Sequence, residues 1–567
     1  MTSAAGGLAR SPLRLRTSTG EKLLGAATVM VAAFLVLGLA VPLSLMLVRS
    51  FQASDGGFAG LANYATYFAT NAPLTSIWNT FVIGAVSTLV TIPLAFGYAY
   101  AIERTNIPFK GIFRSIALIP LVTPSLLFAL SLVQLFGNNG LLKEVMFGVS
   151  IYGPVGIVVG MAFAHFPHTF MVIRTSLSLT DGRLYEVAES LHTTPARMFF
   201  TLTLPGAKYG LVSAALISFM LSITDFGIPK VIGGQYNVLA TDIYKKVIGQ
   251  QDFATGAVVS VVLLVAAVLA FAAVRLVQRR GVAMMSARAI PHQPRRNTRR
   301  DVIFLVFCSA IALAIVGILA IAALSSFIRF WPYNMSLTLK HYNFDLAAGG
   351  GWQAYWNSLK LAGLVAFFGT AIVFLGAYLV EKTRGWRRTV KLVQVLAATP
   401  MAVPGLVLGL AYIFFFNKPG NPLNFLYGSM GILVLATIVH YYSVTHFTMV
   451  TALKQIDPEF ESVSDSLKAP RLRTVWRVTV PLCMTAILDV SIYFFLAAMT
   501  TVSAVVFLYS SRTNLASIAV LNMDDAGEFA YAIAMAMVIV ATCVVARILH
   551  WLLTRGIHRR SLAWRAP

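Results

Sequence analysis

Ionisable side chains in apolar surroundings are the first candidates for function, because burying a charge in an apolar medium is costly. Asp225 stands beside Gly227 and Pro229, which interrupt helix regularity, and Asp489 follows Pro481 by eight residues inside an apolar segment. Each could line a polar path. Each could also be structural, Asp225 in water at an interface and Asp489 paired with a neighbouring helix. Four histidines in apolar segments are expected to be packing residues: His165, His168, His440 and His446.

No residue pattern predicts catalysis, a resident cofactor or a metal centre. The chain has no G-x-x-x-x-G-K-[ST] loop that could cradle ATP phosphates, no G-x-S-x-G elbow and no H-E-x-x-H pair. Its three cysteines, Cys308, Cys483 and Cys543, fall in separate apolar segments without metal-ligand spacing. We therefore expect a protein that is not an enzyme and that takes its energy from a partner or an ion gradient.

Long apolar segments must position these side chains. Hydrophobic residues make up 58% of the chain and charged residues only 11%, which is too apolar for a soluble protein. The composition predicts an all-α polytopic membrane protein, since a spanning helix needs about 20 apolar residues. Twelve segments qualify: 22–47, 79–102, 111–137, 154–177, 208–228, 254–277, 302–327, 357–380, 391–416, 428–450, 484–507 and 529–553.

Positive charge is distributed unevenly between the two ends of these segments. With a cytoplasmic N-terminus, 34 of the 44 Lys and Arg residues fall on the cytoplasmic side. By the positive-inside rule, this asymmetry predicts that both termini are cytoplasmic. The net charge of +23 thus sets topology in a lipid bilayer, and no nucleic-acid partner is expected, because there is no basic soluble module.

The twelve segments repeat as two sets of six. Residues 61–105 align with 339–383 at an offset of 278. Because each half has an even number of spans, both halves have the same orientation and the repeat is parallel. The predicted organisation is a tail (1–21), a first half (22–277), a basic linker (278–301), a second half (302–553) and a second tail (554–567).

Each half contains one polar, basic insert that ends in proline, the first insert at 181–205 and the second at 457–481. In the first insert an early acidic pair, Glu186 and Glu189, would suit a short helix dipole. Val187, Leu191 and Thr194 would lie near one face of that helix. Two copies at matched positions indicate two equivalent docking surfaces for a two-fold partner. The alternative is a pair of amphipathic inserts that only lie on the membrane.

The inserts are similar to the EAA loop of bacterial ABC-importer permeases, in which a short coupling helix sits in a groove of a cytoplasmic ATPase. In the first insert Glu186, Val187 and Ala188 match E-A-A, His192 stands at the usual glycine, and Pro205 closes the motif. In the second insert the positions are taken by Ser462, Val463, Ser464, Lys468 and Pro481, with Glu461 one place early. The resemblance implies that these residues couple the chain to two ATP-binding subunits, which bind the ATP.

The resemblance extends over roughly 60–550 and implies a fold like that of ABC type I importers, in the bacterial inner membrane, served by an extracytoplasmic solute-binding protein. Each half has a W-N-T or W-N-S motif, Trp78-Asn79-Thr80 and Trp356-Asn357-Ser358. Prolines are expected to break the third and ninth helices: Pro120, Pro124, Pro400 and Pro404.

The segment 224–257 bears on the substrate. It most resembles fused permeases for 2-aminoethylphosphonate, whereas ferric-iron permeases share its D-F-G and then diverge. Lys230, Lys245 and Lys246 would suit an anionic ligand or an acidic binding protein. We therefore expect a phosphonate importer. The alternatives are a ferric-iron importer, a secondary transporter of six plus six helices, and a structural scaffold.

Overall fold

The computed structural model describes residues 19–53, 56–282, 294, 296–383, 386–457, 459–467 and 469–562. Lys468, half of the predicted linker and parts of both predicted tails lie outside these residues. The described chain is helical except for one antiparallel pair of short strands, β1 (Ile328–Phe330) and β2 (Asn334–Leu337), and short irregular connections.

Nine helices in the described chain are long and apolar enough to cross a bilayer, and three bent pairs raise the number of candidate spans to twelve if each pair forms one span. The predicted all-α polytopic fold is therefore confirmed. The nine are α1 (Thr19–Leu35) with α2 (Val41–Arg49), α4 (Ala72–Arg104), α7 (Pro154–Ser178), α9 (Pro195–Met198) with α10 (Leu204–Thr224), α13 (Phe253–Val282), α14 (Thr298–Phe327), α15 (Gly351–Leu364) with α16 (Thr370–Lys382), α19 (Met430–Lys454) and α25 (Phe529–Leu562).

Two of the bent pairs are the third and ninth spans, as the prolines predict. The chain turns by 102° between α5 (Lys110–Leu118) and α6 (Ser125–Phe136), and by 116° between α17 (Arg387–Ala398) and α18 (Gly405–Phe416). At both bends the residue before a proline has an extended backbone. A proline ring disfavours the helical conformation of the residue that precedes it, so the helix ends there.

Two predicted spans end earlier than expected. The fifth, predicted at 208–228, ends with α10 at Thr224, and the eleventh, predicted at 484–507, ends with α23 (Met484–Thr500). Helix α23 ends because the backbone of Thr501 is extended, and the Thr501 carbonyl accepts instead from the Ser517 hydroxyl (2.6 Å). After these ends the chain forms short helices: α11 (Gly227–Ile232), α12 (Leu239–Tyr244) and α24 (Ala516–Asp525).

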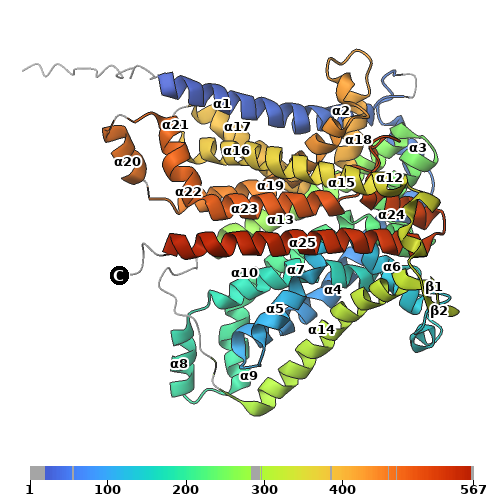
Figure 1. Ribbon diagram of the computed structural model, residues 1–567, viewed down its shortest axis with the longest axis horizontal. Helices are drawn as coiled ribbons and strands as arrows, with labels where there is room; N and C mark the ends of the chain where they lie inside the picture. The colour runs from blue at the N-terminus through green and yellow to red at the C-terminus, as the bar shows by residue number, and fades with distance from the viewer. Residues whose placement is uncertain are drawn as a thin grey trace, which may run out of the picture.

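The first helix of each half packs against the other half (Figure 1). Helices α1 and α2 lie along α16, α17 and α18, and the Tyr412 hydroxyl donates to the carbonyl of Gly38 (2.6 Å). Helix α14 lies along α4, α5 and α6. The two sequence halves are therefore interlocked rather than side by side.

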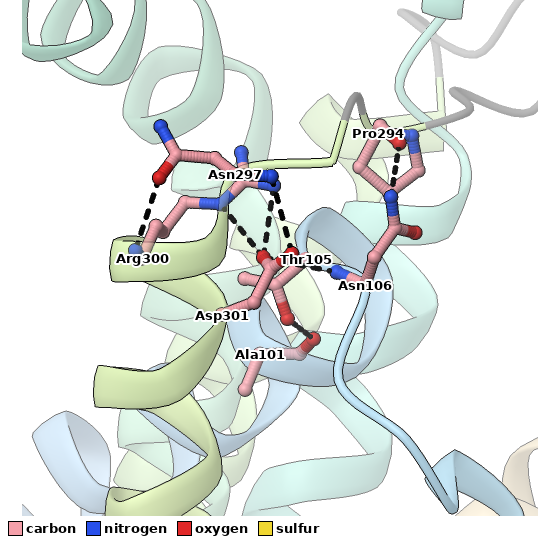
Figure 2. Close-up of polar contacts among 7 residues, drawn as sticks. All are labelled: Ala101, Thr105, Asn106, Pro294, Asn297, Arg300 and Asp301. Atoms are coloured by element: carbon pink, nitrogen blue, oxygen red, sulfur yellow. Dashed lines mark hydrogen bonds and ion pairs between the residues drawn. The ribbon is translucent and has the colours of Figure 1, made fainter.

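The start of α14 is fastened to the loop after α4 (Figure 2). The backbone N–H of Asn106 donates to Asp301 Oδ1 (3.2 Å), and the Asn106 amide donates to the carbonyl of Pro294 (2.6 Å). Asn297 caps α14 by accepting from the N–H of Arg300 (3.1 Å). These bonds hold the start of α14, the first helix of the second half, against the first half.

The two inserts lie at the same end of the helix bundle (Figure 1). They contain α8 (Gly182–Ser190) and α20 (Glu459–Ser466), whereas α3 (Ala62–Phe68), α12, α24 and the strands lie at the opposite end. Equal orientation of both halves is what a parallel repeat predicts.

Candidate functional site

Both inserts begin with an aspartate that caps a short helix. Asp181 Oδ1 accepts from the N–H of Arg183 (3.1 Å), and Asp457 Oδ1 accepts from the N–H of Glu459 (2.9 Å). The prediction that Glu186 and Glu189 favour the dipole at the start of this helix was wrong. The first turn of α8 holds no acidic side chain, and Glu189 lies in its last turn. The carboxylate that stabilises the start of α8 is the capping one.

Each insert presents three exposed apolar side chains at matched positions. They are Leu184, Val187 and Leu191 in the first insert, and Phe460, Val463 and Leu467 in the second. We call these sets the two apolar ridges. The last member is the most exposed in each, at 73% for Leu191 and 75% for Leu467.

The predicted third member of the first ridge, Thr194, lies elsewhere. It caps the next helix, α9, by accepting from the N–H of Arg197 (3.4 Å). The third member of the ridge is instead Leu184, one turn before Val187. Its spacing from Val187 and Leu191 could have been read from the sequence.

The inner face of the first insert is anchored by Tyr185, which is buried. The guanidinium of Arg104, at the end of α4, lies 4.7 Å from the centre of its ring, and Arg104 also donates to the carbonyl of Leu177 (2.7 Å). The Tyr185 hydroxyl shares a 2.9 Å hydrogen bond with Thr203. This insert is thus joined to α4 and to the helix that leads into α10.

The second insert has a different anchor at the same position. Glu461 Oε1 lies 3.0 Å from Nζ of Lys382, at the end of α16. In the aligned repeat, Glu461 corresponds to Tyr185 and Lys382 corresponds to Arg104. Glu461 therefore occupies the anchoring position, which explains why it stands one place before the E-A-A match.

The residues that match E-A-A divide between the two faces. Glu186 and Val187 are exposed, and no partner for the Glu186 carboxylate lies within the described chain, whereas Ala188 is buried. In the second insert Ser462 and Val463 are exposed, and the Ser464 hydroxyl shares a hydrogen bond with Thr474 of α21 (Arg471–Thr474). The outward position of Glu186 fits a contact with a partner.

His192 ends α8 in a left-handed conformation, with φ +50°. Its N–H donates to the carbonyl of Glu189 and the next N–H, of Thr193, donates to that of Ala188, both at 2.9 Å. This pair of bonds is a Schellman motif, in which glycine is the preferred residue. The geometry explains why the similar loops carry glycine here, and Lys468 lies outside the described residues.

The closing prolines stand at different local geometries. Pro205 lies in the first turn of α10, and the helix is continuous from Pro195 to Thr224. Pro481 lies in α22 (Val480–Leu482), after which the chain bends by 75° into α23. The second insert is therefore joined to its span through a bend that the first insert lacks.

At the opposite end, the W-N-T and W-N-S motifs hold the short helices in place. Asn79 donates to the carbonyl of Asn237 (3.0 Å), and the Thr80 hydroxyl accepts from the first N–H of α12 (2.9 Å). Asn357 donates to the carbonyl of Asn514 (3.0 Å), and the Ser358 hydroxyl accepts from the first N–H of α24 (2.8 Å). Helix N-termini leave such donors unpaired, so the motif supplies their acceptor.

The three lysines predicted to face an anionic ligand all have internal partners. Lys230 Nζ lies 2.6 Å from Asp525 Oδ1 and so joins α11 of the first half to α24 of the second. Lys245 donates to Asn237, and Lys246 donates to Gln250 (2.9 Å). Next to this contact, burial and the neighbouring Asp525 carboxylate raise the pKa of Asp524 to about 7.

The two predicted path residues lie in different surroundings. The Asp225 carboxylate is mostly buried rather than in water, accepts from the N–H of Ile228 (3.0 Å) and lies 3.7 Å from Nε2 of His165. Asp489 is more than half exposed and lies 3.2 Å from Nε2 of His550 on α25. The structure does not bring the two aspartates together. Within the described residues, no three His, Cys, Asp or Glu side chains are grouped to hold a metal ion.

Comparisons with known proteins give relatives over most of the chain. The ferric transport system permease protein FbpB of Actinobacillus pleuropneumoniae is 28% identical over 81% of this chain and 67% of its own length. A putative ferric transport permease of Haemophilus influenzae is 28% identical over 76% of this chain and 69% of its own. A crystal structure of a bacterial ABC transporter that imports alginate aligns with TM-score 0.40 and 15% identity, over 47% of this chain and 97% of that one.

The model of one protein family matches the chain twice, once in each half, at residues 92–281 and 372–559. Each match contains one insert and the spans on either side of it. Since the two matches together cover more than half of the sequence, the chain belongs to the family of binding-protein-dependent transport system inner membrane components.

Proposed function

We propose that this chain is the membrane permease of an ATP-driven importer of ferric iron. The observation that carries the importer is the pair of matched apolar ridges at one end of the bundle. Ferric iron is supported by the two relatives with that printed role, each of which aligns with more than three quarters of the chain. The phosphonate hypothesis has less support, because the lysines that favoured an anion already have internal partners.

In this proposal two ATP-binding subunits dock on the two ridges, one on each. The excess of Lys and Arg predicts that this end is cytoplasmic, together with both termini. Glu186 and Ser462 would lie at the edge of each docking surface, and the closing prolines would join it to a span. A solute-binding protein would deliver ferric iron at the opposite end.

Through their anchors, a movement of the inserts would be transmitted to the membrane helices. A displaced first insert pulls on α4 through Arg104 and on α10 through Thr203. A displaced second insert pulls on α16 through Lys382. At the far end, the Lys230–Asp525 contact joins the two halves and would separate when they part. ATP binding and release would thereby alternate the side from which the path is open.

Uptake in cells tests the substrate. Cells without this gene, and the same cells carrying it back, are given labelled ferric iron in one arm and labelled 2-aminoethylphosphonate in the other. We expect ferric uptake to be lost and restored while phosphonate uptake is unchanged. Loss and restoration of phosphonate uptake alone would replace the proposed substrate and leave the importer in place.

A second experiment tests the energy source. The permease is reconstituted in vesicles with its ATP-binding subunit and solute-binding protein. ATP is supplied on the side of the inserts, and a proton or sodium gradient is supplied in a parallel sample. Uptake that requires ATP and the binding protein supports the importer, whereas uptake driven by the gradient alone would favour the secondary transporter.

A further inference from the structure

An open groove of about 530 Å³ lies on the outside of the second half, at the end opposite the inserts. It is formed by α15, the start of α19 and the loop before α24. Its polar lining is Asn357, Lys360, Arg512 and Thr513, and its apolar lining includes Leu364 and Met430. A groove with both kinds of surface suits an amphipathic ligand.

The groove is built by hydrogen bonds between its walls. The Asn357 amide donates to the carbonyls of Arg512 and Asn514, both at 3.0 Å. The Ser510 hydroxyl donates to the carbonyl of Gly428 (2.9 Å), just before α19. The backbone that carries Arg512 is therefore held against α15 and α19.

Two cations line this groove without a counter-charge. No Asp or Glu is among the described residues that line it, and neither Lys360 nor Arg512 forms an ion pair anywhere in the described chain. Unpaired charge at the edge of an apolar medium is unfavourable, so the pair favours a bound anion.

The position of Lys360 relates the groove to the membrane. It is exposed and lies within the span Gly351–Lys382. Trp356, one turn before it, and Trp352, two turns before it, are also exposed on the same face of α15. Exposed tryptophans mark the level of lipid headgroups, so Lys360 lies about one turn below that level, within reach of a phosphate.

The first half has no such pair. At the aligned positions Lys360 is replaced by Val82 and Arg512 by Gln235, since Asn514 corresponds to Asn237, and the W-N motif and its hydrogen bonds are kept. The cations are therefore not needed to hold the short helix.

We propose that this groove binds one anionic phospholipid, its phosphate between Lys360 and Arg512 and an acyl chain along Leu364 and Met430. This inference goes beyond the proposed function and does not depend on the substrate. Orientation of the inserts toward the cytoplasm would place the lipid in the outer leaflet of the membrane.

The test uses the full-length protein in detergent, titrated with dioleoyl phosphatidylglycerol and, separately, with dioleoyl phosphatidylcholine. Bound lipid is counted by native mass spectrometry. We expect one phosphatidylglycerol to bind in preference to phosphatidylcholine. The variant K360V/R512Q, which installs the residues of the first half, should weaken this binding about 30-fold, since each basic residue contributes about 1 kcal/mol near an anionic lipid.

Two controls make the result specific. R329Q/K340V removes two exposed cations at the same end outside the groove and should bind phosphatidylglycerol as before. K360R/R512K keeps both charges and should also bind it. If K360V/R512Q does not fold, K360Q/R512Q replaces it in the same comparison.

Three outcomes would overturn the proposal. They are equal binding of the two lipids, unchanged binding by the charge-removing variant, and equal loss of binding in R329Q/K340V. Inorganic phosphate that displaced phosphatidylglycerol at millimolar concentration would assign the groove to a free anion instead.

Discussion

The two inserts are alike on the face that points out and different on the face that points in. Outside, each carries an apolar ridge at aligned positions. Inside, the first is held by Arg104 over the ring of Tyr185, and the second by the Lys382–Glu461 ion pair. The proposed docking surface is thus repeated, whereas the attachment to the membrane helices is not.

This difference separates two roles of the motif, contact with a partner and attachment to the chain's own helices. Glu186 is exposed and suited to a partner, but Glu461 faces Lys382, whose side chain is 9% exposed. An anchoring residue contacts only its own half, so it can differ between the halves as long as the residue that it contacts differs too. A docking surface must fit the partner, so two identical subunits would keep both copies alike.

The largest expected effect lies on the outer face. Glu186→Lys reverses a charge at the proposed docking surface, and we expect co-purification of the ATP-binding subunit to fall on the order of 30-fold, as for an interface residue worth 2 kcal/mol. Ser462→Lys, the aligned change in the second insert, should have a smaller effect because it removes no carboxylate. An equal loss of co-purification in both variants would show that the two positions contribute equally to docking, against this prediction.

The next effect concerns the anchor of the second insert. Glu461→Lys places two ammonium groups together and should destabilise this insert by about 2 kcal/mol, seen as faster proteolysis within 457–481. Lys382→Glu should do the same, and the double exchange should restore resistance. Glu459→Lys, an exposed change on the same helix, is the matched control. Failure of the double exchange would mean that the ion pair does not hold the insert.

A smaller effect is expected at the anchor of the first insert. Tyr185→Phe keeps the ring under Arg104 but loses the hydrogen bond to Thr203, at a cost of about 1 kcal/mol. Tyr185→Leu also loses the ring and should cost about 1 kcal/mol more. Thermal unfolding of the two variants measures the difference. Equal melting temperatures would remove the guanidinium–ring contact from the anchor.

Composition and local rules predicted much of the fold. Runs of apolar residues predicted twelve spans, because the bilayer requires a minimum length, and the described chain has nine to twelve candidates. The bends before Pro124 and Pro404 follow from the proline ring, which acts on its direct neighbour. The two inserts were found because their pattern is repeated within the chain.

Contacts between distant parts of the sequence were not predictable in this way. The packing of α1 and α14 on the opposite halves depends on which apolar faces fit together, and a span shows no such preference in its composition. The ion pairs of Glu461 with Lys382 and of Lys230 with Asp525 also join remote segments. Single charged residues in a sequence do not indicate their partners.

The smallest expected effect is a gain in stability at His192, whose φ of +50° lies in the left-handed region. A side chain there costs about 1–2 kcal/mol, and glycine avoids this but loses about 0.5–1 kcal/mol of chain entropy. His192→Gly should therefore stabilise the first insert by about 0.5 kcal/mol, measured by slower amide exchange across 181–198. Leu191→Gly, at a position whose φ is −84°, has the same entropic cost without relief of strain and should speed exchange. Faster exchange in both variants would mean that the histidine side chain stabilises the turn more than its backbone strains it.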